Sequence, residues 1–327
     1  MTVSAPNPAG RPLARLSRYG LILALVSVFS IFSAAAPSFL TPGNLQSILV
    51  NNVTLLAIVS IAMTLAVSAG GIDLSVGTAA DFASFAFVSL VLAGKPVALA
   101  LLTALLAGAL VGAFNAILIC AIGVSPFLAT LGTLFIGRSI QQLLTNGGNP
   151  VYLPPTGVPD ALRCLGHGTI AGIPVSLLVA VAVMAGAAVL FSLTRFGRVV
   201  LSIGIQPSVV RYSGIGLGSH VAVIFILAGT VAAIAGIILT STVTVYIPSS
   251  GNAFLLNAIG ATFIGTTFSP FGRPNVAGTV LGVLLLSVVA NGLLLTGLSF
   301  YWQQVFTGSL IFAVLAFSFI NRKAVSA

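Results

Sequence analysis

The sequence predicts an all-α polytopic membrane protein with about ten transmembrane helices and both termini in the cytoplasm. Hydrophobic residues make up 58% of the 327 residues and charged residues only 5%, and the mean hydropathy is +1.20. Roughly 25% of the residues of a soluble domain are charged, so this chain lacks the polar side chains to cover a water-facing surface. Most of its surface is therefore expected to face lipid.

Ten apolar runs account for the predicted helices. A helix needs about 20 residues to cross the hydrocarbon core of a bilayer, and all of the runs except the short eighth approach or exceed that length. The runs are Leu21–Ala36, Leu45–Ala69, Val76–Ala93, Val97–Ile122, Pro126–Leu144, Ile173–Leu193, Ser219–Ser241, Phe254–Phe268, Val276–Thr296 and Tyr301–Ile320.

The basic residues predict the orientation of these spans. Loops on the cytoplasmic side of a membrane protein carry an excess of Lys and Arg. If the N-terminus is inside, ten crossings place most of the basic residues of the loops and termini inside as well. These are Arg11, Arg15 and Arg18 before the first run, Arg195, Arg198 and Arg211 after the sixth, Arg273 after the eighth, and Arg322 and Lys323 at the end. Lys95 is the exception and lies outside. The net charge of +9 therefore indicates topology and not nucleic-acid binding.

One transmembrane domain is expected to take up residues 20–322. Residues 1–19 form a cytoplasmic N-terminal segment and residues 323–327 a cytoplasmic tail. The apolar run that follows residue 19 could imitate a signal peptide, but it is as long as a membrane is thick and predicts a retained first span. The loop 145–172 is expected outside, and the loop 194–217 inside.

The sequence GGIDLSVG, from Gly70 to Gly77, is the most specific local motif. It holds Asp73, one of three acidic residues in a chain without glutamate. A carboxylate next to a membrane-length apolar run is costly and marks either a proton or ion site or a structural device. We favour the second interpretation, in which Asp73 accepts hydrogen bonds from the backbone N–H groups that follow it and caps a helix beginning near Ser75. The structural signature is Gly70, Gly71, Asp73, Ser75 and Gly77.

Asp81 is the other intramembrane carboxylate. It is the residue that an ion-coupled transporter would use, although the sequence places no basic or histidine relay near it.

Uncharged polar side chains occur along several predicted helices. Hydrogen bonds between helices explain many of them. A path for a neutral polyhydroxylated solute would use the same donors and acceptors. The candidate path residues are Asn51, Asn52, Thr64, Asn115, Asn257 and Asn291.

A faint internal repeat links two of these asparagines. Residues 108–127 and 278–302 both contain a pair of glycines four apart, then Asn115 or Asn291, then a Leu/Ile-rich stretch. Repeated halves are typical of transporters. Chance similarity between apolar, glycine-rich helices is the rival explanation.

No enzyme motif is present. The chain has no HExxH, GxSxG, CxxC or GxxxxGK[ST] sequence, and Cys120 and Cys164 lack the spacing of metal ligands. We therefore expect a protein that is not an enzyme, with no cofactor and no metal, and any use of ATP must depend on a partner chain.

The stretch Thr194–Ile215 is too polar to cross the membrane and is cytoplasmic in this topology. It contains a predicted short helix from Pro207 to Tyr212, closed by Gly214. A helix on the cytoplasmic face is a natural docking surface for a soluble partner. The alternative is a basic loop that only fixes the orientation.

These motifs resemble the permease subunits of ribose-type ABC importers, within the branched-chain amino acid/monosaccharide permease superfamily, along almost the whole chain. The similar segments are TPGNLQSILVNN (Thr41–Asn52), GGIDLSVG (Gly70–Gly77), SPFLATLGTLFIGRSI (Ser125–Ile140), TRFGR (Thr194–Arg198) with SGI (Ser213–Ile215), and NGLLLTGLSFYWQQVFTGSLI (Asn291–Ile311). The chain departs from the family pattern at Ile203–Val210 and at Leu255–Ala261, where two carboxylates usual in the family are absent.

The resemblance implies an importer subunit in the bacterial inner membrane that moves a neutral monosaccharide, either a ribose-like pentose or a hexose. It also implies a second permease subunit, identical or paralogous, a periplasmic or lipid-anchored solute-binding protein, and a cytoplasmic ABC ATPase that binds ATP and Mg. The ATPase-coupling residues would be Arg195, Arg198, Gln206, Arg211, Ser213 and Gly214.

Other functions stay open at this stage. The chain could be an ATP-independent secondary transporter or channel for a small polar solute, or a membrane scaffold that transports nothing. As an importer, it could instead carry a nucleoside or a signalling sugar derivative.

Overall fold

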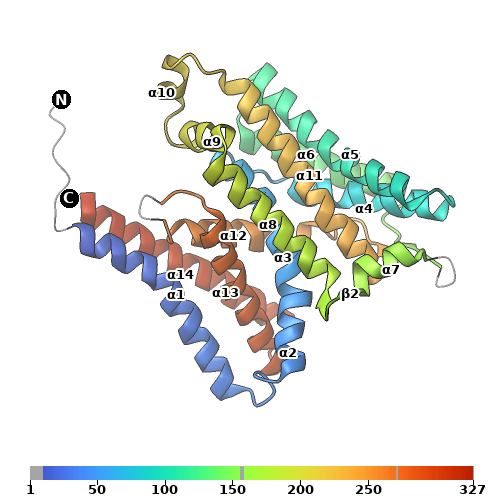
Figure 1. Cartoon of the computed structure of the whole chain (residues 1–327), viewed down its shortest axis with the longest axis horizontal. Coiled ribbons are helices and arrows are strands. Elements are labelled where there is room, and N and C mark those ends of the chain that lie inside the picture. Colours follow the sequence, from blue (N-terminus) through green and yellow to red (C-terminus); the bar gives the residue numbers. More distant parts are fainter. Residues whose placement is uncertain (1–9, 155–157, 270–271, 327) are drawn as a thin grey trace. The chain divides into compact units, whose positions relative to one another are not determined.

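The computed structural model describes residues 10–154, 158–269 and 272–326, and most of this part is helical (Figure 1). Residues 1–9 of the predicted N-terminal segment and residue 327 of the predicted tail lie outside the described residues. Every predicted apolar run is occupied by helix. These helices are α1 (Gly10–Ala35), the stretch α2 (Pro42–Ser47), η1 (Ile48–Val53) and α3 (Thr54–Ser68), then α4 (Val76–Leu92), α5 (Val97–Ala116) with η2 (Ile117–Ile122), α6 (Pro126–Leu144), α8 (Val175–Leu193), α11 (Leu217–Val243), α12 (Asn252–Thr266), α13 (Val276–Leu295) and α14 (Phe300–Ser326).

Five helical stretches in the described part are long and apolar enough to cross a membrane. They are Pro42–Ser68, Val97–Ile122, Val175–Leu193, Leu217–Val243 and Val276–Leu295. The segment Tyr19–Ala35 and the helices α4 and α12 are apolar but shorter. The prediction of a helical, polytopic membrane protein is thus confirmed, while ten spans and two cytoplasmic termini stay predictions.

Some elements lie outside the predicted runs. The predicted external loop contains α7 (Asp160–His167), and the polar stretch after α8 contains α9 (Arg195–Ile205) before the predicted helix α10 (Pro207–Tyr212). Helix α9 was not predicted, although its buried residues Gly197, Val200 and Ile203 follow helical spacing, because it is short and contains two glycines. Two small antiparallel ribbons pair β1 (Val151–Tyr152) with β4 (Val245–Tyr246) and β2 (Thr169–Ile170) with β3 (Ile173–Pro174).

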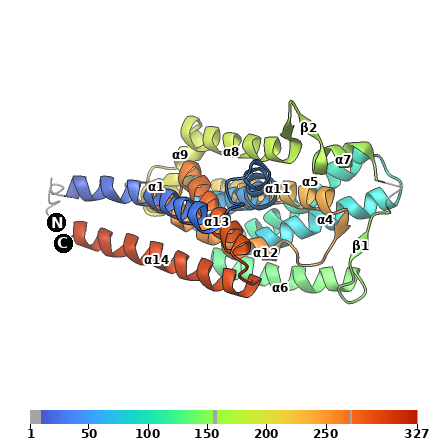
Figure 2. The ribbon, with the colours of Figure 1, turned by 90° about the horizontal axis from the view of Figure 1, so that it is seen from below.

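The chain divides into two compact units. Unit 1 comprises residues 1–53 and 260–327, and unit 2 comprises residues 54–259. In unit 1, α13 packs against α1, η1 and α14. Small residues permit close contact here, since a Cβ at Gly278 would lie 2.1 Å from the carbonyl oxygen of Gly265. The start of α1 and the end of α14 lie at the same end of this unit (Figure 2).

Unit 2 is built around α11, which packs against α3, α4, α5 and α7. Gly108 and Gly112, a pair of glycines four residues apart, bring α5 close to α11. A Cβ at Gly108 would lie 2.4 Å from the carbonyl oxygen of Gly229, and one at Gly112 would lie 2.3 Å from that of Phe225. Only glycine allows α5 to approach the α11 backbone this closely.

Helices α9 and α10 lie at one end of unit 2, and α7, β1 and β2 lie at the opposite end (Figures 1 and 2). The β1–β4 ribbon joins the segments that follow α6 and α11. Unit 2 therefore separates the stretch predicted to dock a partner from the loop predicted to be external.

Candidate functional site

Residues 69–75 form a non-helical segment between α3 and α4, which we call the break. Gly70 has φ +85°, a left-handed conformation that glycine adopts without strain. Asp73 is buried, and its Oδ1 accepts hydrogen bonds from the backbone N–H of Ser75 at 2.8 Å and from the Ser75 hydroxyl at 2.6 Å. Helix α4 begins one residue later, at Val76. Asp73 thus accepts a backbone N–H as expected and acts as a brace for the turn, but it does not cap α4, because Ser75 is the N-cap residue and no side chain among the described residues bonds to the N–H groups of the first turn.

A chain of hydrogen bonds connects this brace to α5 and α6. The Thr133 hydroxyl donates to Asn115 Oδ1 at 2.6 Å, and Asn115 Nδ2 donates to the Ser75 hydroxyl at 2.6 Å. Ser75 in turn donates to Asp73. All three donors point toward the carboxylate, an arrangement in which each bond can polarise the next.

The break also rests on the first turns of α6. The backbone N–H of Leu74 donates to the Thr130 hydroxyl at 3.0 Å. A Cβ at Gly71 would lie 2.7 Å from the Cβ of Pro126. These contacts, together with the hydrogen-bond chain, fix where the chain turns and restarts as a helix.

Helix α9 contacts the break from its other side, through glycine. A Cβ at Gly204 would lie 2.3 Å from the carbonyl oxygen of Ser68 and 3.1 Å from the backbone nitrogen of Gly70. Val200 and Ile203 are the buried neighbours on this face of α9. The contact between α9 and the break is therefore made by backbone atoms without intervening side chains.

The opposite face of α9 and most of α10 are exposed. Every predicted coupling residue is exposed: Arg195, Arg198, Gln206, Arg211, Ser213 and Gly214. Alongside these, α10 presents Tyr212, which is 90% exposed, and Val209, which is 54% exposed. The side chain of Thr194 fixes the start of α9 by accepting from the Gly197 N–H at 3.0 Å. The surface thus combines positive charge with apolar groups.

A second irregular segment, residues 244–252, leads from α11 to α12. Asp81 Oδ1 accepts from the backbone N–H of Gly251 at 2.7 Å and from the Ser250 hydroxyl at 3.1 Å. Gln141 Oε1 accepts from the Ser249 N–H at 2.8 Å and from the Tyr246 hydroxyl at 3.2 Å. Two side chains, from α4 and α6, thus hold this segment. Gln141 is not among the candidates named from the sequence, and only its long-range contacts reveal it.

The structure distributes the candidate path residues over both units. Asn115 belongs to the hydrogen-bond chain of the break. Asn291 forms a reciprocal amide pair with Asn44, at 3.1 and 3.0 Å, and Asn51 donates to the Ser47 hydroxyl at 2.9 Å. Thr64 is buried in α3, and Asn52 and Asn257 are half-buried. For all six residues, a role in a solute path stays a prediction.

Helices of membrane length, with irregular segments between them that buried polar side chains hold in place, indicate a polytopic membrane protein, and such segments are a feature of transporters. The chain belongs to the family described as branched-chain amino acid transport system / permease component, whose family model matches residues 45–315. It is therefore a permease component, which is a transport subunit and not itself an enzyme.

Several curated proteins are similar to the chain along most of its length. The ribose import permease protein of Escherichia coli (strain K12) is 31% identical over 302 residues, covering 92% of this chain and 93% of the relative. That of Bacillus subtilis (strain 168) is 33% identical over 296 residues, covering 90% and 91%. The D-allose transport system permease protein of E. coli K12 is 32% identical over 304 residues, covering 91% and 90%. No solved structure matches the chain significantly.

Proposed function

We propose that this chain is the transmembrane subunit of an ABC importer that moves a neutral monosaccharide across a bacterial inner membrane. Its similarity to ribose and allose permeases over about nine-tenths of its length supports this class of substrate. One structural observation carries the proposal: an exposed, basic α9–α10 surface is joined to the break between two helices by the contact of Gly204 with Ser68 and Gly70. In such an arrangement, a soluble partner that moves the α9–α10 surface also moves the break, and with it the helices beside the transport path.

The exposed α9–α10 surface would receive the partner ATPase. In this proposal the ATPase binds ATP and Mg and docks on the surface from Arg195 to Gly214. A second permease subunit, identical or paralogous, completes the translocation path. A solute-binding protein delivers the sugar at the opposite end of unit 2, where the loop 145–172 lies.

The proposed mechanism transmits movement through the break. When the ATPases close on ATP, they displace α9 and α10. The backbone of α9 at Gly204 then moves against the chain at Ser68 and Gly70. Closely packed backbones transmit such a displacement because there is no side chain to yield between them. The hydrogen-bond chain that runs from Asp73 through Ser75 and Asn115 to Thr133 would move the start of α4 together with α5 and α6, and the solute site changes its exposure.

The proposed topology has ten spans with both termini in the cytoplasm. It is supported by the separation of α9–α10 from α7 and β1 at opposite ends of unit 2. Single cysteines at Tyr212 and at Lys95, in a chain whose Cys120 and Cys164 are replaced, test it. A membrane-impermeant thiol reagent is expected to label position 95 in intact spheroplasts and position 212 only in inverted vesicles. Labelling of both positions from one side would contradict the topology.

Co-purification and reconstitution test the function itself. The tagged chain is expected to bring down an ATPase subunit in mild detergent. Vesicles should take up sugar only when ATP, the ATPase and the binding protein are all present. An ATP-independent secondary transporter would take up solute without these partners and would lose uptake on Asp81→Asn. Uptake by the isolated chain would therefore overturn the importer proposal, and complete absence of uptake with all partners present would favour a scaffold.

A further inference from the structure

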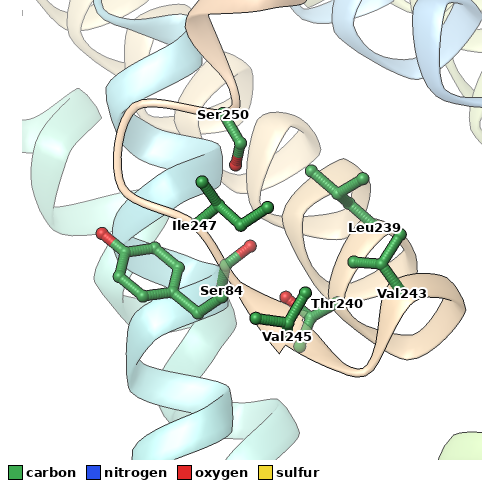
Figure 3. A pocket seen from close by; sticks show the side chains of 8 residues that line it. Ser84, Leu239, Thr240, Val243, Val245, Ile247 and Ser250 are labelled. Atoms are coloured by element: carbon green, nitrogen blue, oxygen red, sulfur yellow. The ribbon is translucent and has the colours of Figure 1, made fainter. Parts of the chain in front are cut away.

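A small cavity lies between α4, α11 and segment 244–252 of unit 2 (Figure 3). Its volume is about 70 Å³. A water molecule takes up about 30 Å³ in the liquid, so the cavity has room for about two water molecules or two hydroxyl groups of a larger ligand. The residues that line it are Ser84 of α4, Leu239, Thr240 and Val243 of α11, and Val245, Tyr246, Ile247 and Ser250 of the segment.

The hydroxyl group of Thr240 is buried against this cavity. Thr240 is only 1% exposed, and its Oγ1 has no hydrogen-bond partner in the part of the chain that the structure describes. Figure 3 shows this oxygen turned toward the space that the lining residues enclose. Buried polar groups are nearly always paired, and an exception in a cavity indicates bound water or another ligand.

The neighbouring residues of α11 show why this hydroxyl is free. In a helix, a Ser or Thr hydroxyl commonly donates to the carbonyl four residues earlier. Ser241 and Thr242 do so, at 2.7 and 2.9 Å. The carbonyl that Thr240 would use belongs to Gly236, and it already accepts from the Ser84 hydroxyl at 2.8 Å. The side chain of Thr240 is therefore turned away from its own helix and toward the cavity.

Two other hydroxyl groups that line the cavity have lone pairs to offer. Ser84 donates its proton to the Gly236 carbonyl, and Ser250 donates its proton to Asp81 Oδ1 at 3.1 Å. A hydroxyl has one proton and two lone pairs, so a ligand can only donate to these two oxygens. Thr240 can donate or accept. A ligand that satisfies all three hydroxyls must therefore donate at least two hydrogen bonds, and it can accept one.

This set of polar atoms selects hydroxyl groups over ions. An anion would find a single side-chain donor, the Thr240 hydroxyl. A hard cation such as Ca²⁺ takes about six or more oxygen ligands, whereas the cavity offers three hydroxyl oxygens beside aliphatic side chains, and the Tyr246 hydroxyl is already bonded to Gln141. We propose that the cavity binds hydroxyl groups, supplied either by ordered water or by two adjacent hydroxyls of a polyhydroxylated solute.

The position of the cavity suits a solute that arrives from outside. Val243 is 45% exposed and Ile247 is 46% exposed, so two of the lining side chains reach the surface of the protein. Val243 ends α11, and the strand β4 that follows pairs with β1 in the loop predicted to be external. In the proposed function, this is the end of unit 2 at which the sugar is delivered.

The segment that closes the cavity is strained on both sides of it. Thr244 has φ +53° and Ser249 has φ +64°, left-handed values that residues other than glycine seldom adopt. Strain of this kind persists where surrounding contacts impose it, and it is concentrated in ligand sites and switch segments. A complete sugar ring is larger than the cavity, so its entry would require this segment to move.

The direction of a stability change tests whether the cavity is occupied. Thr240→Val replaces the hydroxyl with a methyl group of similar size. If hydroxyl groups are bound, the variant loses a hydrogen bond, and the melting temperature of the purified full-length chain should fall by about 2 °C. If the cavity is empty, the variant removes an unpaired buried hydroxyl and the melting temperature should rise. A rise or no change would overturn the proposal.

Thr230→Val is the matched control on the same helix. The Thr230 hydroxyl donates to the Ile226 carbonyl at 2.8 Å, which is the bond that Thr240 lacks. This variant removes a hydroxyl without touching the cavity, and we expect it to change the melting temperature by less than Thr240→Val does.

Added solutes separate the two sources of the hydroxyl groups. The probes are D-ribose, D-allose, sodium chloride and choline chloride, each at equal osmolarity. If a solute binds, one of the sugars should raise the melting temperature of the unaltered chain and of Thr230→Val by about 2–4 °C, and that of Thr240→Val by less. If no sugar acts, the water form predicts ordered density within hydrogen-bonding distance of Thr240 Oγ1 and Ser84 Oγ in a high-resolution map.

Two further results would overturn the proposal. Stabilisation by sodium but not by choline would indicate a cation site. A map in which the Thr240 hydroxyl bonds to the Gly236 carbonyl, beside a cavity without density, would show that the hydroxyl needs no ligand. The solute form rests on the proposed function, whereas the water form does not. Failure of ATP-dependent uptake would refute the transport function without affecting either the melting data or the map.

Discussion

Gly204 of α9 and Gly70 of the break lie backbone to backbone. The Cα of Gly204 lies 3.3 Å from the position that a Cβ would take at Gly70, and Gly70 itself has φ +85°. A side chain at either position would meet the backbone of the other residue, so both positions require glycine. Gly70 is also required because its φ is left-handed. This contact joins the exposed α9–α10 surface to the Asp73 brace, which is where we propose that the permease is coupled to an ATPase.

Charge reversal on α9 should weaken ATPase docking. Arg198 is exposed on the face of α9 away from the break. We expect Arg198→Glu to lower the amount of ATPase that co-purifies with the tagged chain, and the loss should be larger at low salt, where charges are less screened. The control is Lys95→Glu, which changes an exposed cation on the side predicted to be external. Equal ATPase recovery from both variants would place the docking surface elsewhere.

Removing the Asp73 carboxylate should reduce stability and leave the selectivity among sugars unchanged. Asp73→Ala strands the buried N–H and hydroxyl of Ser75, and leaving such a group without a partner costs about 1–3 kcal/mol. Asp73→Asn keeps an acceptor oxygen and should lose less. Thermal unfolding and the yield of assembled complex measure the effect. A change in the ranking of transported sugars, without loss of stability, would show instead that Asp73 contacts the solute.

The hydrogen-bond chain beyond Asp73 predicts energetic coupling between Asn115 and Thr133. Their side chains are bonded at 2.6 Å. The effects of Asn115→Ala and Thr133→Val on unfolding should therefore be non-additive by about 0.6 kcal/mol, the average for hydrogen bonds between membrane helices. Thr103→Val provides the control, because it lies about 18 Å along α5 from Asn115 and should be additive with Asn115→Ala. Additivity in both cycles would mean that the Asn115–Thr133 bond does not stabilise the fold.

In unit 1, the amide pair of Asn44 and Asn291 should behave as a single interaction. Each amide donates to the other, so either alanine substitution breaks both bonds. We expect Asn44→Ala and the double variant to lower the melting temperature by similar amounts, and Asn291→Ala to lower it by less, because Asn44 Nδ2 also donates to the Phe39 carbonyl at 2.8 Å. If Asn291→Ala instead leaves the melting temperature unchanged and alters the affinity for sugar, Asn291 belongs to the solute path.

Sequence reasoning recovered the features that depend on local order. A run of apolar residues predicts a helix whatever its neighbours are, and every predicted run contains helix. Asp73 and its acceptor role are also local, because Ser75 lies two residues further along the chain. The short helix α10 could be predicted from Pro207, which favours the first turn of a helix, and from Gly214, which favours its end.

Features that depend on tertiary packing were beyond sequence reasoning. The amphipathic pattern of α9 indicates one buried face, but the helices that cover this face, α3, α8 and α11, are known only from the packed structure. The contact between Gly204 and Gly70 joins segments separated by most of unit 2. The same holds for Gln141, which meets Tyr246 and Ser249 only after α6 and the segment 244–252 have packed together.

Solute uptake by the complex that carries Gly204→Ala tests the central claim most directly. The added Cβ would lie 2.3 Å from the Ser68 carbonyl oxygen, and overpacking of this kind typically costs about 1–3 kcal/mol. Gly218→Ala is the control, because its Cβ would lie 3.8 Å from the Cβ of Cys120, an ordinary contact. In proteoliposomes with ATPase and binding protein, Gly204→Ala should retain ATPase binding and lose uptake by roughly tenfold or more. Uptake equal to that of Gly218→Ala would contradict coupling through the break.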